Sequence, residues 1–236
     1  METENPFECR INCEKLERGA VLINCSSFFF GKAEMAEQKS FKTRVREEVI
    51  RCARLYKEVF VDYDYLIFST AFEKADYYMI QAHEDNYKHL TGVSSELGAA
   101  EFFRKCYEET LTEEDFSFAK RNQIESVVKG SVRDKIRVLP EIEKLFSEGT
   151  IVEEDFRKNS IRCSFAAGQG TFTMGFVCVP YSRPKTLLRG NELNPAASKR
   201  VELVLRRRRG TKKFDEVLVG NELLLQKYAD KIGSMI

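Results

Sequence analysis

Chain positions 87 to 92 read Tyr87-Lys88-His89-Leu90-Thr91-Gly92. This run holds one of only two histidines in 236 residues, and the sequence predicts that it stands where a strand gives way to a turn. Histidine gives and takes protons near neutral pH, so His89 beside Lys88, Thr91 and the flexible Gly92 is a candidate acid–base site. The alternative is a structural histidine that is hydrogen-bonded to backbone at the end of the strand.

Two β-rich runs lie before this stretch, at residues 65–70 and 77–82. The polar segment between them, residues 73–76, predicts a hairpin turn. Further towards the N-terminus, apolar residues recur at helical spacing and predict an amphipathic helix over residues 41–60. We expect residues 1–42 to form a helical or irregular extension.

The sequence after the run predicts a helical insertion over residues 94–148. Ser94 and Ser95 are suited to cap a helix over residues 99–110. Thr112 and Asp115 form a loose capping box that predicts another short helix. Residues 127–146 predict one or two further helices, bent at Pro140.

Strand patterns dominate after Gly149. Alternating runs predict two strands, at residues 161–165 and 171–179, on either side of a glycine-containing turn. A second pair of strands is predicted at residues 200–206 and 214–219. Residues 221–236 predict an amphipathic helix. The expected fold class is therefore α+β, with N-terminal helices, an antiparallel sheet of about four or more strands, a helical insertion and a C-terminal helix. We expect residues 43–236 to form a single domain.

The composition predicts a globular protein with a phenylalanine-rich core, because 43% of residues are apolar and there are 18 Phe and no Trp. No stretch resembles a membrane span, and the acidic start does not resemble a signal peptide, so we expect a cytoplasmic protein with no membrane partner. The seven cysteines include no Cys-x-x-Cys pair, which agrees with a reducing compartment. Cys9, Cys13 and Cys25 are conceivable zinc ligands, but no nearby histidine completes the set.

A basic cluster interrupts the near-neutral charge of the chain, whose formal net charge is +1. Residues 183–213 hold eleven Lys or Arg and only two acidic residues, and Arg206, Arg207, Arg208 and Arg209 are consecutive. Such a cluster favours contact with nucleic acid or another phosphate, for which we expect the hairpin at residues 200–219. The alternative is a charged hairpin tip that protects a strand edge. Residues 181–188 predict a second basic loop that carries hydroxyl groups.

Four features together resemble a known family: the run at residues 87–93, a helix with Phe102-Phe-Arg-Lys-Cys-Tyr107, the strand around Met174-Gly-Phe176 and the stretch Pro184-Lys-Thr-Leu-Leu188. In this order they look like the phage-type nuclease domain of the barnase–EndoU–colicin–RelE superfamily. The resemblance covers roughly residues 43 to 220 and leaves the N-terminal segment unexplained. It implies N-terminal helices and a four-stranded antiparallel sheet that bears the active site.

The resemblance also implies metal-independent cleavage of RNA without a cofactor. A base takes the proton of a ribose 2′-hydroxyl, an acid protonates the 5′-oxygen that leaves, and cations stabilise the phosphorane-like transition state. His89 is then the base or acid, and Thr91 contacts a phosphate oxygen or orients His89. We expect phosphate contacts from residues that the fold brings near His89, namely Lys88, Arg162, Lys185 and Thr186, and RNA-backbone contacts from Arg206 to Arg209.

Several of these residues have structural alternatives. Thr91 is equally suited to capping the turn, and Arg162 to pairing with a carboxylate on a neighbouring strand. His83 lies six residues before His89, but Asp85-Asn86 is expected to break the strand and to place His83 outside the site.

Two classes of function remain open from the sequence. The first is an endoribonuclease, a toxin or phage-encoded effector acting on structured RNA such as tRNA, with a cognate inhibitor as a further partner. The second is a nuclease-like fold without catalysis that binds RNA or a host protein, for example a phage-encoded inhibitor of host defence. The near-neutral net charge favours the second class, because many ribonucleases are basic overall.

Overall fold

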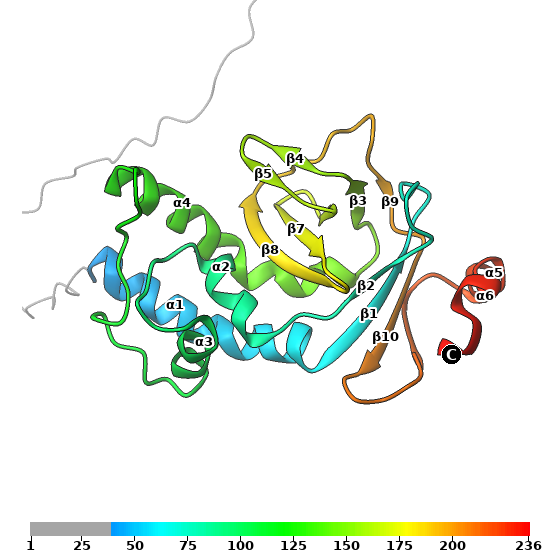
Figure 1. Cartoon of the computed structure of the whole chain (residues 1–236), viewed down its shortest axis with the longest axis horizontal. Helices are drawn as coiled ribbons and strands as arrows, with labels where there is room; N and C mark the ends of the chain where they lie inside the picture. The colour runs from blue at the N-terminus through cyan, green and yellow to red at the C-terminus, as the bar shows by residue number, and fades with distance from the viewer. Residues whose placement is uncertain (1–38) are drawn as a thin grey trace, which may run out of the picture. The chain divides into compact units, whose positions relative to one another are not determined.

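The computed structural model describes residues 39–236 of the chain, and its fold is α+β as the sequence predicts (Figure 1). The helices are α1 (Phe41–Tyr56), α2 (Tyr87–Thr91), α3 (Ala99–Tyr107), α4 (Glu125–Val138), α5 (Glu222–Lys227) and α6 (Ala229–Ile232). The strands are β1 (Tyr63–Phe68), β2 (Tyr78–Ile80), β3 (Ile151–Glu154), β4 (Arg157–Lys158), β5 (Ile161–Arg162), β6 (Phe165–Gly168), β7 (Phe172–Cys178), β8 (Ser182–Arg189), β9 (Lys199–Arg200), β10 (Leu203–Arg208) and β11 (Glu216–Val219). None of the helices within residues 39–236 is long and apolar enough to cross a membrane.

Nine of the strands described in residues 39–236 form one curled sheet with the order β11-β10-β1-β2-β8-β7-β6-β3-β9. All its pairings are antiparallel except that of β2 with β8, where Ile80 lies opposite Ser182. One further backbone hydrogen bond, from the Gln81 N–H to the Ser182 carbonyl at 3.0 Å, closes this contact. After Gln81 the chain leaves the sheet. The end of β2 and the start of β8 therefore lie side by side at the junction between the two antiparallel halves of the sheet.

One face of the sheet packs against α1 to α4 and forms the main core. Figure 1 shows these helices gathered on one side of the curled sheet. Phe165 and Phe176 on neighbouring strands stack with ring centroids 4.7 Å apart, and Tyr65 stacks on Phe146 from the turn that follows α4. The phenylalanine-rich core predicted from composition is confirmed, because these rings are buried together.

The C-terminal helices cover part of the opposite face. Leu66 and Phe68 of β1 point away from α1, because side chains alternate along a strand, and pack with Tyr228 and Ile232 of the C-terminal segment. Asn221 caps α5 by accepting a hydrogen bond from the Leu224 N–H at 3.1 Å. The predicted C-terminal helix is therefore present, but it is interrupted at Tyr228.

Several other predictions are confirmed. The strands predicted at residues 65–70 and 77–82 form the antiparallel hairpin β1–β2, and those at 200–206 and 214–219 form β10–β11. The helix predicted over residues 41–60 is α1 with a π-helical turn at Lys57–Val61. The region predicted to bend at Pro140 is α4 followed by 3-10 helix Leu139–Phe146. The predicted extension at residues 1–42 lies almost wholly outside the described residues.

The prediction of a strand end at His89 is wrong. Residues 87–91 form helix α2, since Tyr87 and Leu90, three residues apart, both bury their side chains in the core. β2 ends earlier, at Ile80.

Three further local predictions also need correction. Gly98 rather than Ser94 or Ser95 precedes α3, and the Ser95 hydroxyl instead donates to the Asp115 carbonyl. The Asp115 carboxylate accepts from the Thr112 N–H at 2.7 Å, yet no helix follows, so this contact stabilises only a turn. Residues 182–189 form strand β8 and not a loop, because all of them except Lys185, which lies at a bulge, pair with residues of β7.

We predict that Phe165→Ala lowers the free energy of unfolding by about 3–5 kcal/mol, because it removes a fully buried ring that stacks on Phe176 and contacts Tyr78. Urea unfolding followed by circular dichroism measures this change. Leu223→Ala is the matched control, since Leu223 is 74% exposed and its loss is expected to cost less than about 0.5 kcal/mol. Equal losses for the two variants would contradict this account of the core.

Candidate active site and its basic surroundings

Helix α2 presents His89 at the surface while its neighbours hold the helix in place. Tyr87 and Leu90 are fully buried, and His89 is exposed. The Lys88 ammonium donates to the carbonyls of Ser95 at 3.2 Å and Leu97 at 2.8 Å. Lys88 therefore fixes the chain that follows α2, and the phosphate contact expected for it stays a prediction.

Gly92 ends α2 and opens a path for a lysine from another helix. Its φ of 78° is left-handed, a conformation that glycine adopts without strain. A Cβ at this position would lie 2.7 Å from Cδ of Lys135 on α4, so a side chain would displace the lysine. With glycine here, the Lys135 ammonium reaches the His89 carbonyl and donates a hydrogen bond of 3.1 Å.

The surroundings of His89 and Lys135 lower the pKa of both side chains. Partial burial of the ring lowers the pKa of His89, the cations Lys88, Lys135 and Lys120 lower it further, and Asp85 opposes them. Burial of its side chain, with a smaller effect of Lys120, lowers the pKa of Lys135 to about 8. At neutral pH the imidazole of His89 is thus neutral, and the lysine at its backbone carbonyl is protonated but releases its proton more readily than usual. Such a pair provides both a base and an acid.

Thr91 has a structural position next to this pair. Its side chain is fully buried, and its hydroxyl donates to the Lys88 carbonyl at 2.8 Å. The same oxygen accepts a long hydrogen bond, 3.4 Å, from the Val93 N–H. These contacts are the turn-capping alternative that the sequence left open. They orient His89 only through the backbone of α2.

The structure brings Lys185 and Arg162 together but separates Thr186 from His89. The Lys185 ammonium donates to the Arg162 carbonyl at 2.8 Å. Leu187 of β8 packs in the core cluster that contains Leu90, so the preceding Thr186 points to the other face of β8. On that face its methyl group lies next to Gly175.

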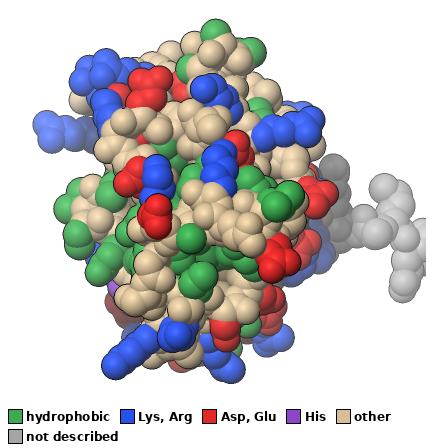
Figure 2. All heavy atoms as spheres, turned by 90° about the vertical axis from the view of Figure 1, so that its right-hand side faces the viewer, with side chains coloured by type: hydrophobic (Ala, Val, Ile, Leu, Met, Phe, Trp, Pro, Cys, Tyr) green, Lys and Arg blue, Asp and Glu red, His purple; other side chains and the backbone are tan. Residues whose placement is uncertain are grey.

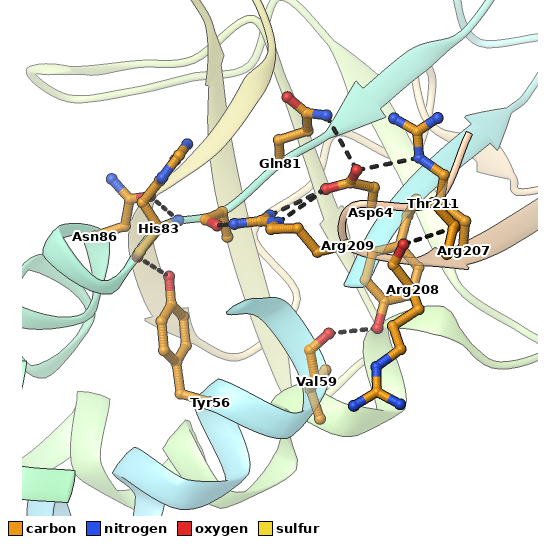
Figure 3. A network of polar contacts seen from close by, with 12 residues as sticks. Tyr56, Val59, Asp64, Gln81, His83, Asn86, Arg207, Arg208, Arg209 and Thr211 are labelled. Carbon is orange, nitrogen blue, oxygen red and sulfur yellow. Dashed lines mark hydrogen bonds and ion pairs between the residues drawn. The ribbon is translucent and has the colours of Figure 1, made fainter. Parts of the chain in front are cut away.

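The four consecutive arginines are split by strand alternation (Figure 3). Arg207 and Arg209 both bind Asp64 of β1, which is almost fully buried, with their Nε atoms 3.1 and 3.2 Å from its oxygens. Arg206 forms a bidentate pair with Glu216 and lies over the ring of Tyr63. Among residues 39–236, Arg208 is the member of this run without a carboxylate partner, and its side chain is exposed.

His83, which sequence reasoning placed outside the site, has a firmly held backbone. The Tyr56 hydroxyl donates to its carbonyl at 2.9 Å, its N–H donates to the Asn86 side chain at 2.9 Å, and Arg209 donates to the carbonyl of the preceding Ala82 at 2.6 Å (Figure 3). The His83 side chain is exposed, and its pKa is lowered by partial burial and by Arg183 and Arg209. Asn86, which the sequence predicts to break a strand, ends the short 3-10 helix Glu84–Asn86, and its side chain caps the His83 N–H.

No local sequence pattern indicates that Lys135 or Arg183 lies near a histidine. Both come from elements distant in sequence, α4 and β8. Within residues 39–236, no three side chains of His, Cys, Asp or Glu are grouped so as to hold a metal ion. Cys9, Cys13 and Cys25, the conceivable zinc ligands, lie outside the described residues.

An exposed histidine among cations offers the proton transfer and the stabilisation of negative charge that cleavage of a phosphodiester requires. The model of one nuclease family, the phage-Barnase-EndoU-ColicinE5/D-RelE like nuclease 4 family, matches residues 48–178. The match covers more than half of the chain and includes His83, His89 and Lys135, so the chain belongs to this family and the resemblance inferred from sequence is confirmed. No curated protein and no solved structure matches the chain.

We predict that Asp64→Ala lowers the free energy of unfolding by about 2–3 kcal/mol, because Arg207 and Arg209 lose their shared carboxylate. Fully buried pairs typically lose about 3–5 kcal/mol, but here both arginines reach solvent. Urea unfolding again measures the change. Asp76→Ala is the control, since its pair with Lys231 is exposed and is expected to contribute less than about 1 kcal/mol. A loss at Asp64 no larger than at Asp76 would contradict the assigned role of Asp64.

Proposed function

We propose that this protein is a metal-independent endoribonuclease in which His89 is the general base and Lys135 is the general acid. The observation that carries the proposal is the placement of the Lys135 ammonium at the His89 carbonyl, across a glycine that leaves room for the lysine stem. Membership of a nuclease family supports a phosphodiester as substrate. The choice of RNA rests on the chemistry of the two groups, because RNA carries in its 2′-hydroxyl a neighbouring nucleophile that a base activates without a metal.

The reaction balances with these two groups. Neutral His89 takes the proton of the 2′-hydroxyl, and the 2′-oxygen bonds to the adjacent phosphorus. The bond from phosphorus to the 5′-oxygen breaks, and protonated Lys135 gives its proton to that oxygen. The products are a 2′,3′-cyclic phosphate and a 5′-hydroxyl end. Lys120, whose charge acts on both His89 and Lys135, is a further cation for the charge on the phosphorane-like transition state.

The other residues expected from the sequence take supporting roles in this proposal. Thr91 positions His89 through the Lys88 carbonyl, and Lys88 itself holds the loop after α2. Lys185 and Arg162 are joined to each other and offer a cationic contact for RNA outside the reacting phosphate. Thr186 faces away from α2 and takes no part in the proton transfers.

The proposed substrate is structured RNA such as tRNA, and the proposed role of the protein is that of a toxin or phage effector. The competing function is a nuclease-like fold that binds RNA or a host protein without cutting. Cleavage measurements separate the two functions directly.

We predict that the purified protein cleaves tRNA in the presence of EDTA and leaves 2′,3′-cyclic phosphate ends. His89→Ala and Lys135→Met are each expected to lower the rate about 10²- to 10⁴-fold, because each removes one proton-transfer group. Lys129→Met is the control, since Lys129 lies on the same helix, and its pair with Glu125 and its contact with the Phe118 ring involve neither His89 nor Lys135. Absence of cleavage by the wild type, or equal activity of wild type and His89→Ala, would refute the proposal.

We predict a bell-shaped dependence of kcat/KM on pH. The rate rises as His89 loses its proton, at a pH below the ordinary value of 6.5, and it falls as Lys135 loses its proton near pH 8. The alkaline limb is expected to move to higher pH in Lys135→Arg, because guanidinium stays protonated. An alkaline limb that stays near pH 8 in this variant would show that another group is the acid.

A further inference from the structure

The turn between β7 and β8 exposes an aromatic ring beside the end of β2. Val179 is 74% exposed and Tyr181 is 44% exposed. The turn is tight, since the Val179 N–H donates to the Tyr181 carbonyl at 3.1 Å. Within the described part of the chain, Tyr181 stacks on no other aromatic ring and its hydroxyl makes no hydrogen bond. The ring is therefore free to receive a ligand.

The two residues after Tyr181 have polar atoms without partners. Ser182 Oγ and Arg183 Nε are both buried and have no hydrogen-bond partner among residues 39–236. Buried polar groups are normally satisfied, so the unpaired guanidinium nitrogen of Arg183 points to an absent acceptor. An anion supplies such an acceptor, and phosphate in particular fits a guanidinium.

The surroundings of Arg183 are cationic. Arg183 and Arg209 both act on His83 at the end of β2, where Ser182 pairs with Ile80. Asp64 is shared between Arg207 and Arg209, so this ion cluster retains one positive charge. The acidic residue that faces His83 from its own segment is Asp85. An exposed aromatic ring next to net positive charge is the combination that single-stranded nucleic acids bind.

Among the described residues, the face of the molecule that carries α5 and β10 does not combine an exposed aromatic ring with net positive charge. On the face that Figure 2 shows, Lys and Arg side chains alternate with Asp and Glu around hydrophobic side chains. Arg206 of β10 is paired with Glu216 and Lys227 of α5 with Glu202. Mixed charges of this kind give no attraction for a polyanion, so the β7–β8 turn is the better candidate for contact with RNA.

We propose that Tyr181 and Arg183 form a nucleotide subsite for single-stranded RNA, in which the tyrosine ring stacks on an unpaired base and the Arg183 guanidinium binds an adjacent phosphate. The subsite rests on the proposed function only in taking RNA as the ligand. Stacking requires a base outside a duplex, so the subsite restricts the enzyme to loops and unpaired segments of structured RNA.

Fluorescence anisotropy with the full-length protein tests the subsite. The probes are a single-stranded oligonucleotide with 2′-O-methyl groups, which the proposed 2′-hydroxyl reaction does not cleave, and a duplex of the same sequence. Tyr181→Ala is expected to weaken binding of the single strand about 5- to 150-fold, the range that corresponds to about 1–3 kcal/mol for one stacked base. Binding of the duplex is expected to stay unchanged, and Tyr181→Phe is expected to bind like the wild type. Tyr107→Ala is the control, because Tyr107 is 40% exposed and lies on α3.

Arg183→Gln tests the phosphate contact. It is expected to weaken binding of single strands of any sequence and to reduce the salt dependence of log K by about one unit of slope. An unchanged salt slope would overturn the phosphate contact. Equal losses in Tyr181→Ala and Tyr181→Phe, or equal losses for single strand and duplex, would overturn base stacking.

These results are separable from a failure of the proposed function. If the protein does not cleave RNA but Tyr181→Ala still weakens single-strand binding, the result supports the subsite and refutes catalysis at His89. If the protein cleaves RNA and Tyr181→Ala binds and cleaves single strands as the wild type does, the result supports catalysis and refutes the subsite.

Discussion

A single buried carboxylate, that of Asp64, joins the elements on which both histidines depend. It accepts hydrogen bonds from Arg207, Arg209 and Gln81, which come from β10, the residues after it and the end of β2. A buried charge is tolerated only when donors surround it, so these three contacts are required together. They also fix the register of β10 on β1, since a slip by one residue would turn Arg207 to the other face of the sheet. Arg209 extends the network to the Ala82 carbonyl, immediately before His83.

The segment from His83 to His89 follows this network, and different parts of the core hold its two ends. At its start, Tyr56 of α1 binds the His83 carbonyl. At its end, Lys135 of α4 crosses Gly92 and binds the His89 carbonyl. Between these contacts the buried side chain of Tyr87 anchors α2. The two histidine rings are thus exposed on a backbone that neighbouring elements determine, which is how proteins place reactive groups accurately.

The sequence was sufficient wherever the determining interactions are local. Alternation in β1 and helical spacing in α1 reflect burial of one face, and both elements were found near their true bounds. Sequence reasoning failed at α2, since a five-residue helix has too few positions to show a period, and its stability comes from Tyr87 and Leu90 in the core. It also failed for Lys135, which meets His89 across 46 residues of sequence, a distance over which no local pattern operates. The RNA contacts expected for Arg206 to Arg209 stay predictions.

The small net charge of +1 is no argument against an RNA substrate, because the charges are unevenly distributed. Arg206, Arg207 and Arg209 of the basic run are paired with carboxylates within the sheet. By contrast, Lys120 and Lys135 near His89, and Arg183 near His83, have no carboxylate partner in residues 39–236. At physiological salt the Debye length is about 8 Å, so a phosphate at either histidine is affected mainly by the charges next to it. Lys120, Lys135 and Arg183 are among the cations that the fold leaves unpaired, and they attract a polyanion to the surroundings of the two histidines.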